Sequence, residues 1–236
     1  MLENLPGILG HALRDQRAGM EQTAFNRIPL RGGTAAIDLR SLAFVDHGPI
    51  PALYTADGSG TSPPLQWTGV PAAADSLVLI VEDADSPTPQ PLVHAIVVNL
   101  DAEDGSLPDG ALAEDNATLR EAASDDGVAP RSADNSVSDA EAPAATQPRL
   151  GRNSYLLTGW LPPDPPPGHG VHHYVFQIFA LAPGGRLTGT PGRDAVLAAL
   201  SEHALASGRL VGTYTRPDAT VRDTEREAVP TSMPLA

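Results

Sequence analysis

The sequence predicts a mainly β fold with a few helices at its periphery. Pro and Gly are abundant, with 24 and 22 occurrences among 236 residues, and this content favours strands and loops over long helices. Four runs rich in β-branched and aromatic residues, each bounded by Pro, Gly or Asp, are typical of strands. These runs cover residues 76–82, 92–98, 173–181 and 209–213. Hydrophobic residues make up 41% of the chain, which is enough for a core.

Two helical segments are expected outside the strands. Between Pro191 and Gly208, an apolar stripe with helical spacing predicts a helix, with Asp194 in its first turn and Gly208 as its C-terminal cap. The stripe consists of Val196, Leu197, Leu200, Ala204 and Leu205. Residues 1–20 also carry leucines at helical spacing, and a short helix that packs on its own domain is favoured there over a membrane or partner surface. The same segment could serve a homodimer interface.

Composition excludes several functions. The chain has 15 basic residues against 29 acidic ones and a formal net charge of -14, which argues against a nucleic-acid partner. All the basic residues are Arg, so a Schiff-base lysine, a pyridoxal phosphate anchor and a P-loop lysine are excluded. The absence of Cys excludes disulfides, a thiolate nucleophile and a Cys-based zinc site. No cofactor is expected.

Charge is concentrated in one stretch. Residues 101–149 hold twelve acidic residues against three Arg and no aromatic residue, which predicts a flexible acidic insertion at about 104–148. One domain over residues 1–216 then accounts for the rest, with 217–236 as a mobile tail. The N-terminus has neither a basic region nor an unbroken apolar run, and no membrane span is present. A cytoplasmic location without integral membrane association is therefore expected.

Ionisable side chains stand where three predicted strands end or begin. With a period of two, Asp83 follows Val81 on one strand face, His94 shares a face with Ile96, and His172 and Tyr174 share a third. If the strands are neighbours, Asp83, His94, His172 and Tyr174 surround one pocket at a sheet end. Periodicity alone leaves that adjacency open.

Two motifs near these residues resemble those of the phosphatidylethanolamine-binding protein family, whose eukaryotic members include Raf kinase inhibitor protein. They are Asp-x-Asp-x-Pro at residues 83–87 and Gly-x-His-x-Tyr at residues 170–174. Similar stretches at 62–67, 151–155 and 210–214 follow in the family's order, so the resemblance covers roughly 38–100 and 150–216 and is closest to the bacterial, Raf kinase inhibitor-like branch. One departure is Leu161-Pro162-Pro163-Asp164-Pro165, which places an acid near the pocket rim.

The resemblance implies a large antiparallel sheet packed on a smaller sheet, with peripheral helices and a small anion pocket. Its pocket residues correspond to Asp83, His94, His172 and Tyr174, with Pro87 after a cis peptide bond. Gly170 and His169 border the mouth.

The implied ligand is phosphate or a phosphoryl-containing small molecule of phosphoethanolamine type, which imidazole and phenol donors suit. A regulatory role of the kinase- or protease-inhibitor kind, through a protein partner that no residue identifies, is also implied. The alternative is a metal-dependent or Ser-dependent hydrolase that uses the same Asp and His residues.

Overall fold

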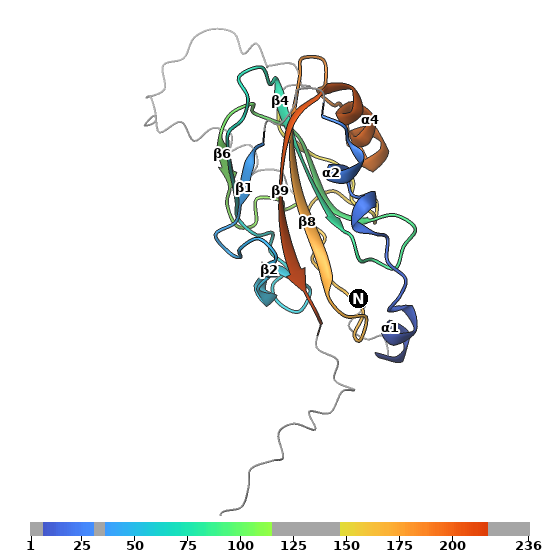
Figure 1. Ribbon diagram of the computed structural model, residues 1–236. Coiled ribbons are helices and arrows are strands. Elements are labelled where there is room, and N and C mark those ends of the chain that lie inside the picture. The colour runs from blue at the N-terminus through green and yellow to red at the C-terminus, as the bar shows by residue number, and fades with distance from the viewer. Residues whose placement is uncertain (1–6, 31–35, 115–146, 217–236) are drawn as a thin grey trace, which may run out of the picture.

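The computed structural model describes residues 7–30, 36–114 and 147–216. Figure 1 shows strands in the middle of the molecule, with helices gathered on one side. The helices are α1 (Gly7–Leu13), η2 (Met20–Gln22), α2 (Ala24–Arg27), η3 (Ala52–Tyr54) and α4 (Arg193–His203). The strands are β1 (Asp38–Arg40), β2 (Gly48–Pro49), β3 (Leu65–Thr68), β4 (Ser76–Asp83), β5 (Leu92–Leu100), β6 (Gly105–Leu107), β7 (Arg149–Leu150), β8 (His172–Leu181) and β9 (Ala204–Tyr214).

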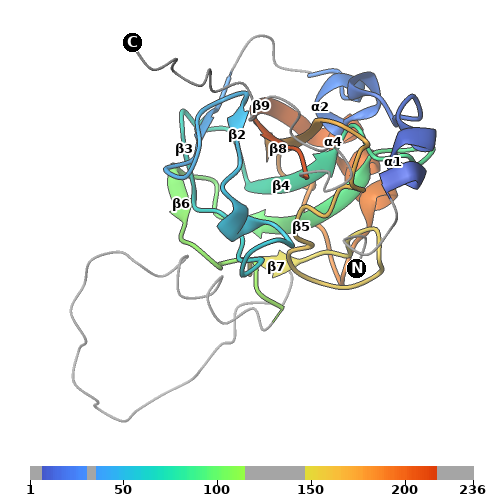
Figure 2. The ribbon, with the colours of Figure 1, turned by 90° about the horizontal axis from the view of Figure 1, so that it is seen from below.

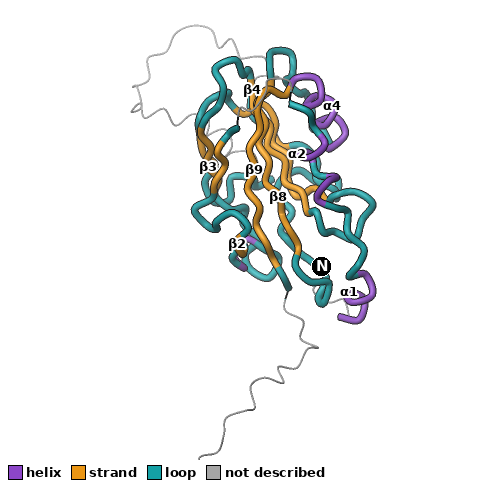
Figure 3. The backbone as a smooth tube through the Cα atoms, in the orientation of Figure 1, coloured by secondary structure: helices purple, strands orange, loops and turns teal. Residues whose placement is uncertain are grey.

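The strands of the described residues form two sheets. The larger has the order β2-β9-β8-β4-β5-β7, and the smaller has the order β1-β3-β6. Neighbouring strands in both are antiparallel, except for the short β2, which runs parallel to β9. The smaller sheet lies on one face of the larger sheet, and α2 and α4 cover the other (Figures 2 and 3). This arrangement is the one that the resemblance implies.

The central strands are buried on both faces because each face meets another layer. Leu79, Phe176 and Ile178 belong to the cluster between the two sheets, together with Trp67 of β3. Residues one position away, such as Ile80, pack with the apolar side of α4 instead. The strands therefore lack polar alternation, and the continuous apolar runs in the sequence have this cause. All four predicted strands are confirmed, each with somewhat wider bounds.

The predicted helix is confirmed, but its end is wrong. α4 ends at His203, and Ala204 already begins β9, which makes ten residue pairs with β8. Gly208 is not a helix cap. It lies inside β9, where a Cβ atom would stand 2.0 Å from the Ile37 carbonyl oxygen. This close approach of two backbones, rather than a turn, requires glycine.

The predicted start of the flexible acidic insertion, at about residue 104, is wrong. β6 pairs with β3, and Leu107, Ala111 and Leu112 are buried. Residues 104–114 are thus part of the packed domain because their few apolar side chains reach the core between the sheets. The remainder of the insertion, 115–146, and the tail 217–236 lie outside the described residues.

The N-terminal helical segment is shorter than the predicted residues 1–20. α1 covers Gly7–Leu13, and residues 1–6 lie outside the described part. α1 packs on its own domain, since a Cβ atom on Gly10 would meet the carbonyl oxygen of Pro167. Within the described residues, no helix is long and apolar enough to cross a membrane.

Candidate functional site

A small cavity lies where β4 ends and β5 and β8 begin. Its volume is about 60 Å³. Antiparallel pairing brings these strand ends to one edge of the sheet, with Asp83 opposite both Leu92 and Tyr174. The lining residues are Asp83, Ser86, Pro87, Leu92, His94, Tyr155, Leu161, Pro162, Asp164, Pro165, Pro166 and His172. The adjacency that periodicity left open is therefore present.

His94 reaches this cavity through an irregularity in β5. The register between β4 and β5 shifts after Val81, so that Val81 faces Ala95 and Glu82 faces Val93. The extra residue, His94, turns toward the face that carries Tyr174, while Ile96 packs on the helical side. The prediction that His94 shares a face with Ile96 is wrong because a β-bulge breaks the period of two.

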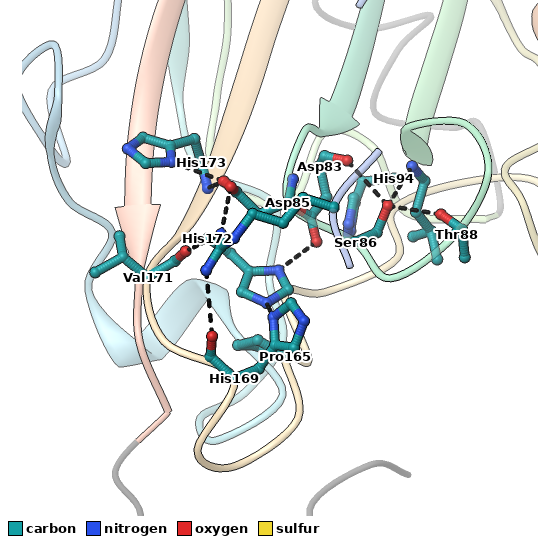
Figure 4. Close-up of polar contacts among 12 residues, drawn as sticks. Asp83, Asp85, Ser86, Thr88, His94, Pro165, His169, Val171, His172 and His173 are labelled. Atoms are coloured by element: carbon teal, nitrogen blue, oxygen red, sulfur yellow. Dashed lines mark hydrogen bonds and ion pairs between the residues drawn. The ribbon is translucent and has the colours of Figure 1, made fainter. Parts of the chain in front are cut away.

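Asp83, His172 and His169 form a buried row of hydrogen bonds, visible in Figure 4. The Asp83 Oδ2 atom lies 2.7 Å from Nδ1 of His172, and Nε2 of His172 lies 2.7 Å from Nδ1 of His169. Nε2 of His169 donates to the carbonyl oxygen of Leu13 at 2.8 Å. The three residues are 4%, 1% and 0% exposed. Asp83 therefore orients His172 from one side, and His169 contacts it from the other.

His94 presents a bare ring nitrogen. Its Nδ1–H donates to the Leu161 carbonyl at 2.6 Å, which fixes the ring. Its Nε2 atom is buried and has no hydrogen-bond partner among the described residues. Burial lowers the pKa of His94 below its ordinary value, although the charge of Asp83 opposes this effect. At neutral pH the ring is therefore uncharged, and Nε2 acts as an acceptor.

Tyr174 supplies a donor beside that acceptor. Its ring meets the His94 ring edge-on, with centroids 5.1 Å apart. Its hydroxyl is also buried without a hydrogen-bond partner among the described residues. Burial raises the pKa of Tyr174 well above its ordinary value, and the charge of Asp83 adds to this. The phenol keeps its proton, so among the described residues the ring with an unpartnered donor contacts the ring with an unpartnered acceptor.

A second carboxylate, Asp164, lines the cavity. It belongs to the stretch 161–165, where the sequence departs from the family pattern. Arg216 donates to Asp164 Oδ1 at 2.5 Å and to the Asp57 carboxylate at 3.0 Å. Arg216 is buried, with an exposed fraction of 6%. The acid at the rim is thus paired with an internal cation.

The expected cis peptide bond before Pro87 is wrong. All described peptide bonds, including Ser86–Pro87, are trans. Side-chain hydrogen bonds shape this turn instead. Asp83 Oδ1 accepts from the Asp85 amide at 2.8 Å, and the Ser86 hydroxyl accepts from the Leu92 amide at 3.1 Å. Pro87 nevertheless lines the cavity.

The other expected residues lie at different distances from the cavity. Asp83, His94 and His172 line it. Tyr174 is not among the lining residues, but its ring contacts the His94 ring edge-on. Gly170 and His169 do not line it. Gly170 has a φ of 100° in the turn before β8, and His169 acts through His172.

Sequence reasoning missed three groups: Arg216, the Leu13 carbonyl, and Arg17, which donates to the His169 carbonyl at 3.2 Å. No motif marks these groups, because strand pairing and chain docking bring them to the site from distant parts of the sequence.

The described residues add no support for the hydrolase alternative. Among the described residues, no group of three or more His, Asp or Glu side chains is placed to hold a metal ion. The serine that lines the cavity is Ser86, whose hydroxyl contacts the Asp83 carbonyl and the Thr88 hydroxyl.

Comparison with known proteins agrees with the fold. The family model described as Phosphatidylethanolamine-binding protein matches residues 40–215. A UPF0098 protein of Methanothermobacter thermautotrophicus is 34% identical over 180 residues, which are 76% of this chain and 99% of that protein. LppC of Mycobacterium tuberculosis, which carries a lipoprotein name, is 32% identical over 180 residues, which are 75% of this chain and 72% of that protein.

Solved structures show the same arrangement. The phosphatidylethanolamine-binding protein homologue CT736 of Chlamydia trachomatis has a TM-score of 0.58 and 30% identity, covering 78% of this chain and 99% of that one. YbcL of Escherichia coli has a TM-score of 0.61 and 24% identity, covering 77% and 99% of the two chains. The chain belongs to the phosphatidylethanolamine-binding protein family. The cytoplasmic location stays a prediction.

Proposed function

We propose that this chain is a binding protein for small molecules that carry a phosphoryl group, with phosphoethanolamine-like head groups as the preferred chemistry. The observation that carries the proposal is the pair of unpartnered buried atoms, Nε2 of His94 and the Tyr174 hydroxyl. Leaving a buried polar group without a partner costs about 1–3 kcal/mol, so two of them on rings that contact each other favour a polar ligand.

The pair suits a phosphoryl group that brings or takes up one proton. The Tyr174 hydroxyl can donate to a phosphoryl oxygen. His94 Nε2 can accept from a P–OH group, or can donate once His94 is protonated. In both cases the complex holds one proton more than the separate dianion and neutral imidazole.

The carboxylates give the site its second preference. Asp83 and Asp164 both line the cavity, and their oxygens can accept further hydrogen bonds although His172 and Arg216 pair with them. A ligand with an ammonium group beside its phosphoryl group can donate to these carboxylates, which a bare phosphate dianion cannot do. A zwitterion therefore fits the site better than phosphate alone.

A larger groove beside the cavity can take the rest of such a ligand. It has a volume of about 780 Å³ and shares Leu92 and Tyr155 with the cavity wall. Pockets of this size are usual for small-molecule sites. The cavity of about 60 Å³ has room for the head group only. The regulatory role that the resemblance implies stays a prediction.

Titration calorimetry at pH 6.0 tests the proposal with three probes: O-phosphorylethanolamine, inorganic phosphate and ethanolamine. We expect O-phosphorylethanolamine to bind most tightly, phosphate more weakly, and ethanolamine not measurably. His94→Phe should abolish the binding of both phosphoryl probes. If neither phosphoryl probe binds, or if their binding is unchanged in His94→Phe, the assignment is overturned. Metal analysis and a generic esterase assay on the same sample test the hydrolase alternative.

A further inference from the structure

An N-terminal strap, defined here as residues 10–19, crosses the loops that border the cavity. Its backbone makes two hydrogen bonds with the loop after β4: Ala18 N to Ser86 O at 2.9 Å and Gly19 N to Ala84 O at 2.8 Å. Arg17 donates to the Val171 carbonyl at 2.9 Å and to the His169 carbonyl at 3.2 Å, and it also pairs with Asp85. In Figure 1, α1, where the strap begins, lies at the end of the sheet where β9 finishes.

The contact at Gly10 is especially close. A Cβ atom there would lie 1.9 Å from the Pro167 carbonyl oxygen and 3.0 Å from the His169 amide nitrogen. Because these neighbouring atoms belong to the backbone, there is no space for even one methyl group. Docking of the strap on the 167–169 loop therefore depends on glycine at this position.

The hydrogen bonds of the buried row require one proton more than two neutral imidazole rings carry. Asp83 accepts from His172 Nδ1, and the Leu13 carbonyl accepts from His169 Nε2, so both outer ring nitrogens hold protons. The inner pair of nitrogens, 2.7 Å apart, needs one further proton between them. Two imidazoles with three protons carry one positive charge. The outer nitrogen of His172 contacts the Asp83 carboxylate, whereas that of His169 contacts the neutral Leu13 carbonyl, so the charge resides on His172 beside Asp83.

The row leaves His172 no nitrogen for a ligand. Nδ1 is bonded to Asp83, and Nε2 is bonded to His169, as Figure 4 shows. We propose that the strap is an internal latch on the pocket: through the Leu13 carbonyl it holds His169 on Nε2 of His172, and a phosphoryl oxygen that takes this nitrogen displaces His169 and releases the strap. This inference rests on the proposed function and adds a regulation to the same site.

The exchange is balanced in protons. Neutral His169 leaves with its Nε2 proton, and His172 stays protonated on both nitrogens, paired with Asp83. The freed Nε2–H then donates to the anionic oxygen, a charge-assisted bond stronger than the neutral one it replaces. With such a latch, the apparent affinity is the intrinsic affinity multiplied by the fraction of molecules in which the strap is undocked.

Gly10→Ala in the full chain tests the latch at a position that does not itself line the cavity. The added methyl group should undock the strap and strengthen the binding of O-phosphorylethanolamine at pH 6.0 at least about fivefold. Gly189→Ala is the matched control, because a Cβ atom there meets nothing within 4 Å and Gly189 lines neither the cavity nor the groove, so its affinity should equal that of the wild type. His169→Ala, which removes the competing ring, should strengthen binding as Gly10→Ala does.

Hydrogen exchange at the Ala18 and Gly19 amides gives an independent readout. Both amides should exchange faster in wild-type protein with saturating O-phosphorylethanolamine than without it, and fast in Gly10→Ala with or without the ligand. If the ligand binds the wild type while exchange stays unchanged and Gly10→Ala gains no affinity, the latch is refuted and the proposed function stands. If wild type, Gly10→Ala and His169→Ala all fail to bind, both proposals are refuted.

Discussion

The state of His94 predicts a specific pH dependence of binding. In the free protein, Nδ1–H is bonded to the Leu161 carbonyl at 2.6 Å, and Nε2 has a lone pair without a partner among the described residues. Burial keeps the pKa of His94 below its ordinary value, so the ring is neutral at pH 7. An anionic oxygen that meets Nε2 must therefore arrive with a proton taken up from solution.

The size of the effect follows from proton linkage. Each proton taken up on binding changes the affinity about tenfold per pH unit, which is about 1.4 kcal/mol. Other groups near His94 also titrate or carry charge: Asp83, the His172 and His169 pair, and Asp164 with its arginine partner. The contribution of His94 is therefore measured as the difference between two proteins in the pH dependence of the affinity.

His94→Gln is the variant that isolates this contribution. Its amide donates a hydrogen bond at every pH from about the position of Nε2. Between pH 6.5 and 8, the slope of log Kd against pH should be smaller in His94→Gln than in the wild type by about one, measured by titration calorimetry. Sulfate, which brings no proton in this range, should show the same difference as O-phosphorylethanolamine. Equal slopes in the two proteins would refute the account of His94.

Three further predictions concern single groups. Tyr174→Phe removes a buried hydroxyl that has no partner among the described residues, so thermal unfolding of the free protein should be unchanged or occur at higher temperature. The affinity for O-phosphorylethanolamine should fall by about 1 kcal/mol, and a large loss of stability without ligand would show that the hydroxyl has a partner. His94 and His169 both have pKa values lowered by burial, so the folded state is most stable above about pH 6.5, where both rings are neutral in the folded and the unfolded chain. Below about pH 6.5, the free energy of unfolding should decrease by up to about 1.4 kcal/mol per pH unit for each group. Urea unfolding that is independent of pH between about 5 and 6.5 would contradict this. Glu82 is fully buried and pairs with Arg193, whose side chain is 9% exposed, so Glu82→Ala leaves that cation without its carboxylate and should cost about 3–5 kcal/mol in urea unfolding. Arg40→Ala, at the exposed pair with Asp38, should leave urea unfolding nearly unchanged, and similar costs for the two variants would refute the importance of burial.

The sequence by itself determined the parts of this protein that depend on local patterns. Continuous apolar runs bounded by Pro, Gly and Asp marked the central strands, because a strand covered on both faces has no need for polar positions. Asp83, His172 and Tyr174 could be placed together from motifs at the strand ends, since these motifs are short and lie next to the strands that position them.

Tertiary structure decided the features that depend on contacts between distant segments. Gly208 resembles a helix cap in sequence but is required by the Ile37 carbonyl 2.0 Å from its missing Cβ atom. The bulge that turns His94 into the cavity arises from pairing with β4, and no periodicity in β5 alone shows it.

The hydrogen-bond partners of the site were decided in the same way. The Leu13 carbonyl and the Arg216 guanidinium reach the pocket only after the strap docks and β9 pairs with β8. Backbone carbonyls carry no sequence signal, because every residue has one. The number of protons on the two histidines, and with it the charge of the pocket, was therefore fixed by folding.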